Sequence, residues 1–347
     1  MLERTGPPDV LRWTRVPEPT PGTGEVRVTV ESIGLNYAEV LSRKGLYGWA
    51  PPRPYVPGME AAGVVDAVGE GVAMAPGRRV VVGTQSGAYA EKVVVPAAQA
   101  LPWPEGFSSA EAAAFPVNFM TAWVALKVLA QVRPGETVSI SPAAGGVGTA
   151  AVQLARASGC RVVALAGSRE KLERVRTLGA DVTACYGSGD LPGELRDALE
   201  GGGIDVAVEM VGGDVFRCVR DAMAPFGRIV VAGYASLDYR WWDPVSLWRA
   251  WRGIPRLSLG EQFRRSLGLF ATHLGYLLDD PRRMGRVWEG LTEFVTHHGI
   301  RPQVGHVLPA TAIADAHRLM ESRKSYGKIV LEMGNGPGGA SGQGVNR

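Results

Sequence analysis

The sequence TVSISPAAGGVGTAAVQLARASG, residues 137–159, decides the fold of this chain. Val138 and Ile140 alternate with serines, as in a short strand, and apolar residues recur at helical spacing from Val147 onward. The turn between them carries only small side chains, so backbone N–H groups can approach a pyrophosphate at the helix N-terminus. The stretch therefore predicts a strand, a tight turn and a helix that together bind a dinucleotide.

The glycine motif is incomplete, because Ala143 stands where the first glycine of G-x-G-x-x-G is usual. Its context supports the prediction. A second strand-like run follows at 161–166 and a helical run at 170–178, and further apolar runs come at 204–211 and 228–233. Strands that alternate with helices predict an α/β domain with a doubly wound parallel sheet of the Rossmann type.

The residues before this domain follow a different pattern. Short β-rich runs at 25–33, 62–68, 79–82 and 88–95 are interrupted by Pro and Gly. This pattern is typical of an antiparallel, barrel-like domain. A strand, a helix and a strand are also predicted after residue 301.

Composition limits the classes of protein to consider. The chain has 347 residues, enough for two domains, and its net charge of +3 indicates no general affinity for nucleic acid. We see no signal peptide and no apolar run of the ~18 residues that a membrane-spanning helix needs. The three cysteines are scattered, which fits a reducing compartment. We therefore expect a cytoplasmic protein.

Five short stretches carry a resemblance to a known family. They read GLNY at 34–37, RKGLY at 43–47, PGMEAAGVV at 57–65, AAGGVG at 143–148 and YGKIVL at 326–331. With them, nearly all of residues 1–333 resembles the zinc-free quinone oxidoreductase branch of the medium-chain dehydrogenase/reductase superfamily. Within that branch, residues 119–126 and 273–277 are similar to the vesicle amine transport protein 1 (VAT-1) group.

The resemblance implies a GroES-like catalytic domain, split in the sequence, and a Rossmann domain. We expect the GroES-like domain to span residues 1–115 and 301–333 and the Rossmann domain to span residues 116–300. The Gly-rich tail, 334–347, is predicted to be disordered.

The residues argue against a metal site. The first 159 positions contain no Cys and no His, and all five His lie at position 273 or later, whereas zinc sites need clustered thiolates or imidazoles. Zinc-dependent relatives carry a His after the glycine of the Gly58 motif, and here that residue is Met59. His297 and His298 are adjacent on a predicted helix and do not share a face.

The cofactor prediction rests on charge. Rossmann proteins that prefer NAD place an acid about 20 residues beyond the glycines, but here the only nearby acid, Glu170, lies past the end of the second strand. Ser168, Arg169 and Lys171 offer a hydroxyl and two cations to the 2′-phosphate of NADPH, although a solvated helix start would look similar. The resemblance adds Tyr186 beside the adenosine.

The resemblance also implies the remaining cofactor contacts, at the glycine turn, at the start of the Rossmann domain and at the end of the apolar run 228–233. These residues are Asn118, Thr121, Ala144, Gly145, Gly146, Val147, Gly148, Gly233 and Tyr234.

Hydride transfer to a conjugated acceptor needs a group that stabilises the oxyanion or supplies a proton. The resemblance places Asn36, Tyr47 and Thr121 in catalytic positions, the first two as amide and phenol donors and the third beside the nicotinamide. We expect Tyr37 only to pack in the cleft wall. These residues favour NADPH-dependent, metal-free reduction of quinones or related conjugated carbonyl compounds. An enoyl-thioester or 2-alkenal reductase is the alternative.

Two features bear on partners. Residues 238–267 carry four Trp and six Arg, a mixture that suits a lid over the cleft, a dimer contact or a membrane surface. A membrane- or lipid-associated VAT-1-like protein with weak reductase activity is therefore a third possibility.

Residues 269–277 are predicted to form the last strand of the parallel sheet, and its open edge predicts a homodimer.

Overall fold

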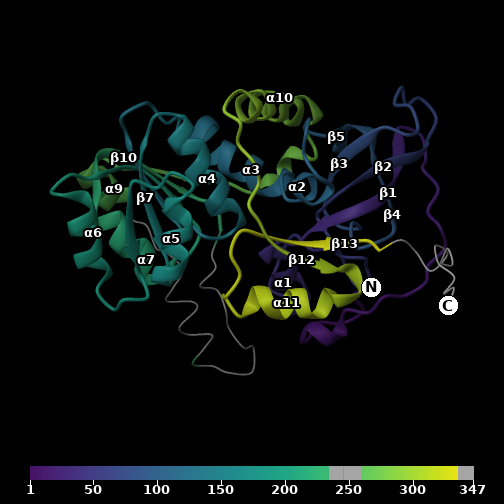
Figure 1. The fold of residues 1–347 in the computed structure, drawn as a ribbon, viewed down its shortest axis with the longest axis horizontal. Coiled ribbons are helices and arrows are strands. Elements are labelled where there is room, and N and C mark those ends of the chain that lie inside the picture. The colour runs from purple at the N-terminus through teal and green to yellow at the C-terminus, as the bar shows by residue number, and fades with distance from the viewer. Residues whose placement is uncertain (234–244, 246–258, 335–347) are drawn as a thin grey trace, which may run out of the picture. The chain divides into compact units, whose positions relative to one another are not determined.

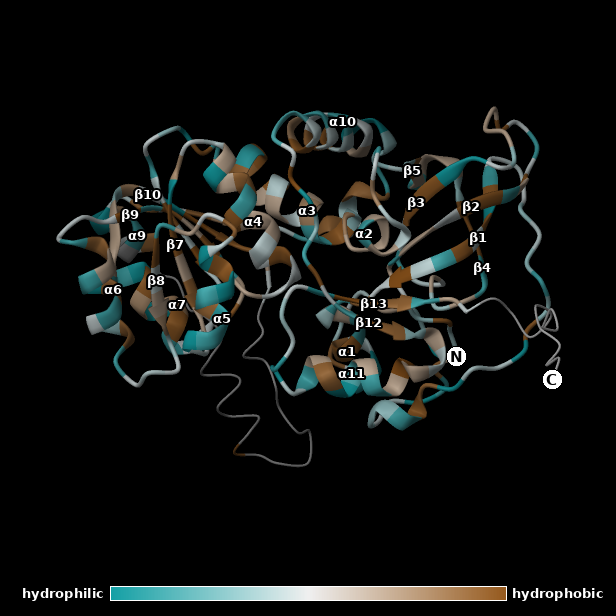
Figure 2. Cartoon of the chain, in the orientation of Figure 1, coloured by the Kyte–Doolittle hydropathy of each residue, from teal (hydrophilic) through white to brown (hydrophobic). Residues whose placement is uncertain are grey.

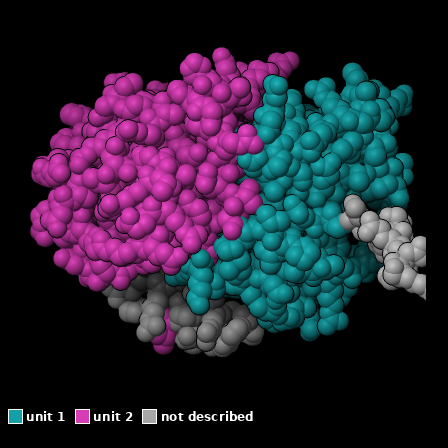
Figure 3. Space-filling model, in the orientation of Figure 1, with its two compact units in different colours: residues 1–114, 306–324, 329–347 teal, residues 115–305, 325–328 magenta. Residues whose placement is uncertain are grey.

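The computed structural model describes residues 1–233, 245 and 259–334. The chain divides into two compact units. Unit 1 comprises Met1–Ala114, His306–Lys324 and Ile329–Arg347, and unit 2 comprises Phe115–Gly305 and Ser325–Lys328 (Figure 3). Each unit has its own sheet.

Unit 2 is built around a six-stranded sheet whose paired strands all run parallel. In chain order its strands are β6 (Thr137–Ser141), β7 (Arg161–Ala166), β8 (Val182–Cys185), β9 (Ile204–Glu209), β10 (Met223–Val231) and β11 (Gly268–Ala271). The spatial order is β11-β10-β9-β6-β7-β8, so the winding reverses between β6 and β9. Ligands of such sheets bind at the carboxyl ends of the strands near this reversal. The predicted parallel sheet is thus confirmed.

The helices of unit 2 are α3 (Pro116–Trp123), the π-helix η3 (Val124–Leu129), α4 (Gly146–Ala157), α5 (Arg169–Arg176), α6 (Leu191–Leu199), α7 (Gly213–Asp221), α9 (Leu259–Arg265), the 3-10 helix η4 (Leu274–Leu277) and α10 (Pro281–His297). Helices α4 to α7 pack against the sheet, whereas α3 packs against α4 and α10 packs against α3 (Figure 1). The strand predicted at 269–277 is shorter than expected, because the chain leaves the sheet after Thr272 and coils into η4.

Unit 1 contains the β-rich part of the chain. Its strands are β1 (Glu25–Gly34), β2 (Glu60–Val68), β3 (Arg79–Gly83), β4 (Lys92–Pro96), β5 (Ala100–Pro102), β12 (Val304–Pro309) and β13 (Lys328–Glu332). Those strands follow the order β12-β13-β1-β2-β3-β5, with β4 also paired to β1. The pairings of β1 are antiparallel, and its Val26, Val28 and Val30 point into the core.

Three helices and three 3-10 turns complete unit 1. They are α1 (Tyr37–Lys44), α2 (Ser109–Ala113), α11 (Ile313–Glu321), η1 (Pro8–Val10), η2 (Ala97–Gln99) and η5 (Ala310–Ala312). Figure 2 shows apolar residues concentrated on the strands of both sheets, as expected for two hydrophobic cores.

Candidate functional site

The glycine turn lies between β6 and α4, as the sequence predicts. Helix α4 begins at Gly146 with Gly145 as its N-cap, so its first amide groups, including those of Val147 and Gly148, have no acceptor within the helix. These groups carry partial positive charge. A side chain at Gly145 would project into open space. This end of α4 can therefore receive the pyrophosphate of a dinucleotide, with Ala144 at its edge.

Asn118 borders the turn. It lies on α3 and is buried, and a Cβ at Gly146 would overlap its side-chain amide. A larger residue at position 146 would therefore require the Asn118 amide to move. The side chain of Asn118 thus lies directly against the first residue of α4.

Residues 325–328 also reach the glycine turn, although they follow it by almost 200 positions. The Gly327 N–H donates to the Ala144 carbonyl at 2.9 Å, and Lys328 Nζ lies 3.4 Å from Asn118 Oδ1. Because Asn118 borders the start of α4, the ammonium of the buried Lys328 is a candidate counter-charge for a pyrophosphate there. Lys328 is not among the predicted site residues, although the sequence carries a signal for it, a lysine that opens the apolar strand KIVL.

The residues proposed to bind the adenosine part of the cofactor follow β7 directly. Ser168 is the N-cap of α5, but its side chain makes no capping hydrogen bond. Arg169 and Lys171 lie in the first turn of α5, and burial lowers the pKa of the half-buried Lys171. Glu170 is exposed and pairs with Arg174 at 3.1 Å. Its carboxylate is thus engaged along the helix surface.

Tyr186 follows β8 and packs beside the end of β7. Its ring lies 3.1 Å from the position of a Cβ at Gly167, and its backbone N–H donates to the Ala166 carbonyl at 3.0 Å. The aromatic ring and Ser168 therefore lie at the same edge of the sheet. Gly233 follows β10 at that edge, whereas Tyr234 is outside the described residues.

Thr121 lies on α3, one turn beyond Asn118, and is largely buried. Its hydroxyl donates to the Val117 carbonyl at 2.6 Å. Because the hydroxyl proton is used within the helix, the oxygen is left as an acceptor. An acceptor suits the carboxamide NH₂ of a nicotinamide.

Glu209 is a buried acid that sequence reasoning missed. It ends β9, beside the end of β6, and its carboxylate accepts from Ser141 Oγ at 3.1 Å and from the Val211 and Gly212 amides at 2.9 Å. Burial raises the pKa of this carboxyl. Glu209 thus holds the two strand ends together where the winding of the sheet reverses.

Asn36 belongs to unit 1, between β1 and α1, and two buried acids hold it. Its side-chain Nδ2 donates to Glu60 Oε1 at 2.9 Å, and its backbone N–H donates to Glu39 Oε2 at 2.7 Å. Since a carboxylate only accepts, Glu60 fixes which end of the amide faces it. One of the two side-chain protons of Asn36 is therefore already committed.

Glu39 is itself held by a chain of buried donors. Its carboxylate accepts from the Met59 N–H at 2.8 Å and from Tyr89 Oη at 2.7 Å. Tyr89 Oη is 3.3 Å from His317 Nε2, and the Arg43 guanidinium donates to His317 Nδ1 at 3.4 Å.

The charge state of His317 follows from its surroundings. Burial, with a smaller effect of the Arg43 charge, lowers the pKa of His317 to about 3. The ring is neutral at physiological pH, so Nδ1 accepts from Arg43 and Nε2 donates to Tyr89. This chain of hydrogen bonds fixes the loop that carries Asn36.

Tyr47 follows α1 and is partly buried. Burial, with a smaller effect of the Glu39 charge, raises the pKa of Tyr47 to about 12. The side chain is therefore a neutral phenol at physiological pH and able to donate a hydrogen bond. Asn36 and Tyr47 belong to unit 1, and Thr121 and the cofactor candidates belong to unit 2.

All of the chain's His and Cys residues lie in the described ranges. Among the residues of these ranges, no group of three or more His, Cys, Asp or Glu side chains is placed to hold a metal ion. No helix in the described part of the chain is long and apolar enough to cross a membrane.

Comparison with known proteins gives two family matches. Residues 22–105 match the alcohol dehydrogenase GroES-like domain, and residues 146–255 match the zinc-binding dehydrogenase family. Together they confirm the predicted combination of a GroES-like and a Rossmann fold.

Individual relatives agree with these matches. The synaptic vesicle membrane protein VAT-1 homolog of Rattus norvegicus is 35% identical over 328 residues, which cover 91% of this chain and 78% of the relative. The quinone oxidoreductase of Thermus thermophilus, solved also in complex with NADPH, is 37% identical with a TM-score of 0.77, over 96% of this chain and 98% of that chain. The CurK enoyl reductase is 29% identical with a TM-score of 0.82, over 96% and 98%. This chain therefore belongs to the medium-chain dehydrogenase/reductase superfamily.

Proposed function

We propose that this protein reduces quinones or related conjugated carbonyl compounds with NADPH, by hydride transfer and without a metal ion. The observation that carries the proposal is the open glycine turn at the start of α4, bordered by Asn118 and Lys328. A bound nicotinamide would supply the hydride, and the similar Thermus enzyme is a quinone oxidoreductase that was solved with NADPH.

The chain's own residues would have three tasks. The N-terminus of α4 and Lys328 would neutralise the pyrophosphate. Thr121, whose hydroxyl proton is already donated, would accept from the nicotinamide carboxamide. Tyr47, a neutral phenol whose pKa is raised by burial, would donate to the acceptor oxygen as negative charge develops there.

The proposal that no metal ion takes part rests on the side chains present where zinc-dependent relatives carry metal ligands, and on the buried acids nearby. One matching family is named for zinc binding, but Met59 has no side-chain donor suited to zinc, and the buried acids Glu39 and Glu60 are bonded to backbone and amide N–H groups. Cys160 and Cys185 are buried free thiols.

Buried free thiols of this kind also support our proposal that the protein is cytoplasmic, because a reducing compartment keeps cysteines unpaired.

An enoyl-thioester or 2-alkenal reductase is the second enzymatic candidate, and the similarity to the CurK enoyl reductase favours it. One assay separates the candidates: NADPH oxidation by the purified protein with quinones, 2-alkenals and enoyl-CoA esters, each with and without a chelator. We expect the highest kcat/KM with a quinone and no loss on chelation. A clear preference for enoyl-CoA would favour the alternative, and loss on chelation would refute the metal-free mechanism.

We further propose that the protein is a homodimer. Among the described strands β11 pairs only with β10, which leaves an edge of the parallel sheet open. Leu269 on this strand and Tyr276 just after it are large apolar side chains with exposed fractions of 38% and 73%. Pairing of β11 with a second copy would cover the edge. Light scattering at micromolar concentration should give twice the chain mass, and a monomer there would contradict the proposal.

Membrane-surface association of residues 238–267 is a second candidate function, although most of the segment lies outside the described residues. The observation that favours it is α9, where Leu259 and Phe263 lie one turn apart and are almost fully exposed, next to Arg264. Co-sedimentation with anionic vesicles tests it. The wild-type protein should sediment and the Leu259→Ser, Phe263→Ser double variant should not. No sedimentation of the wild type would exclude this function.

A further inference from the structure

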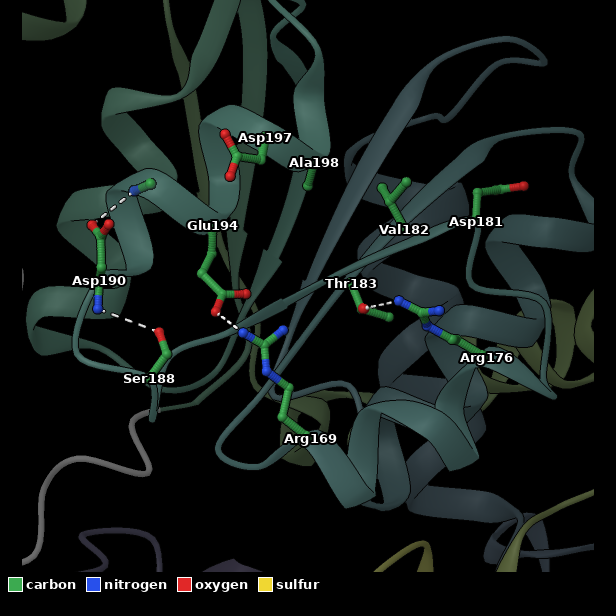
Figure 4. A pocket seen from close by; sticks show the side chains of 11 residues that line it. Arg169, Arg176, Asp181, Val182, Thr183, Ser188, Asp190, Glu194, Asp197 and Ala198 are labelled. Atoms are coloured by element: carbon green, nitrogen blue, oxygen red, sulfur yellow. Dashed lines mark hydrogen bonds and ion pairs between the residues drawn. The ribbon is translucent and has the colours of Figure 1, made fainter.

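Arg169, one of the two cations proposed for the 2′-phosphate, already has an anionic partner. Its guanidinium forms an ion pair with Glu194 of α6 (Figure 4). The Arg169 side chain is 67% exposed and that of Glu194 only 14%. The other carboxylate oxygen of Glu194 accepts from the Cys185 N–H at 3.0 Å. Glu194 is thus anchored to the end of β8, and Arg169 is the partner that can move.

The pair lies on a cavity of about 480 Å³ with an acidic lining. Its carboxylates are Asp181, Asp190, Glu194 and Asp197, against the two cations Arg169 and Arg176, and Asp181 is also paired with Arg156 at 2.9 Å. A phosphate dianion would be repelled by this lining. A 2′-phosphate near Ser168 and Lys171 would therefore have to draw Arg169 away from the acidic cavity in order to use it.

We propose that Glu194 is a specificity-determining residue, which weakens the preference for NADPH by withholding Arg169 from the 2′-phosphate. The inference rests on the proposed function. Glu194 and the phosphate compete for one guanidinium, so phosphate binding has to break an ion pair first. Removing the charge of Glu194 abolishes this competition and also removes a nearby negative charge.

The variant Glu194→Gln tests the inference with little change of shape, because a glutamine oxygen can still accept from the Cys185 N–H. The probes are 2′,5′-ADP and 5′-AMP, which differ only in the 2′-phosphate. By calorimetric titration, we expect Glu194→Gln to bind 2′,5′-ADP roughly three- to ten-fold more tightly, as loss of a partly exposed ion pair and one repulsive charge implies. Binding of 5′-AMP should not change, which also shows that the variant is folded.

Two further variants identify the cause. Asp197→Asn removes the same charge from the same cavity but leaves the Arg169 ion pair intact, so it should bring only the smaller gain that comes from reduced repulsion. In an Arg169→Ala background, Glu194→Gln should likewise bring only this smaller gain. Weaker or unchanged binding of 2′,5′-ADP by Glu194→Gln would overturn the inference, as would an equal gain from Asp197→Asn or a gain that is undiminished without Arg169.

The same titrations separate this inference from the proposed cofactor. Wild-type protein that binds 2′,5′-ADP no more tightly than 5′-AMP would contradict the preference for NADPH. A gain on Glu194→Gln would still support the role of Glu194, because the phosphate site would then be masked in the wild type. If neither the wild type nor the variant prefers 2′,5′-ADP, both proposals fail.

Discussion

Replacing Tyr47 with phenylalanine should lower kcat for a 2-alkenal by about 100- to 1,000-fold, the usual cost of losing one preorganised oxyanion donor. The loss with a quinone should be much smaller, because a quinone is reduced with little help from a proton donor. Asn36→Ala should show the same selectivity. Tyr47 can donate because it is a neutral phenol, and burial raises its pKa to about 12, away from the ionised form.

Single-turnover rates with saturating NADPH would measure these effects without a contribution from product release. Tyr37→Phe is the matched control, since it removes a phenol directly after Asn36, ten residues before Tyr47, and should leave both rates unchanged. If Tyr47→Phe and Asn36→Ala cause equal, small losses with both substrates, these residues only shape the cleft.

Lys171→Ala should weaken NADPH binding about ten- to a hundred-fold and leave NADH binding nearly unchanged, because one hydrogen bond to a charged group contributes about 1.5–3 kcal/mol. Lys171 is half-buried, and burial lowers its pKa, but a phosphate dianion beside the amine would favour its charged form. Arg169→Ala should have the smaller effect, because Glu194 already engages that guanidinium.

Calorimetric titration of both cofactors measures these affinities, and Arg196→Ala, which removes an exposed cation from α6, controls for the change in net charge. The preference for NADPH should decrease with added salt if the site is exposed. Equal affinity of the wild-type protein for NADH and NADPH would refute the assignment. Glu170 would then become the candidate ribose ligand.

The sequence predicts the parallel sheet because its signal is local. The strands β7 and β9 are short, largely apolar runs and β6 alternates apolar residues with serines, and each is followed by residues that turn into a helix. The glycine turn is likewise predictable, because small residues and the start of α4 lie within a few positions of each other.

The partners of the site residues are not predictable in this way, because they come from distant positions. Glu60 is 24 residues from Asn36, and Glu194 is 25 residues from Arg169. Nothing local in the sequence indicates that Arg169 forms an ion pair with Glu194, or that Asn36 donates one side-chain proton to Glu60. Resemblance supplies the identity of the site residues, and only the fold supplies their hydrogen-bond partners.

Residues 325–328 set the order in which the protein can mature during its synthesis. The strands of the parallel sheet have all emerged from the ribosome by residue 271, yet Gly327 and Lys328, which complete the wall of the glycine turn, emerge almost 60 positions later. A nascent chain that has already folded its sheet would still lack this wall. Cofactor binding would then begin only near the end of translation, so a chain interrupted shortly before residue 325 would be folded in part but not active.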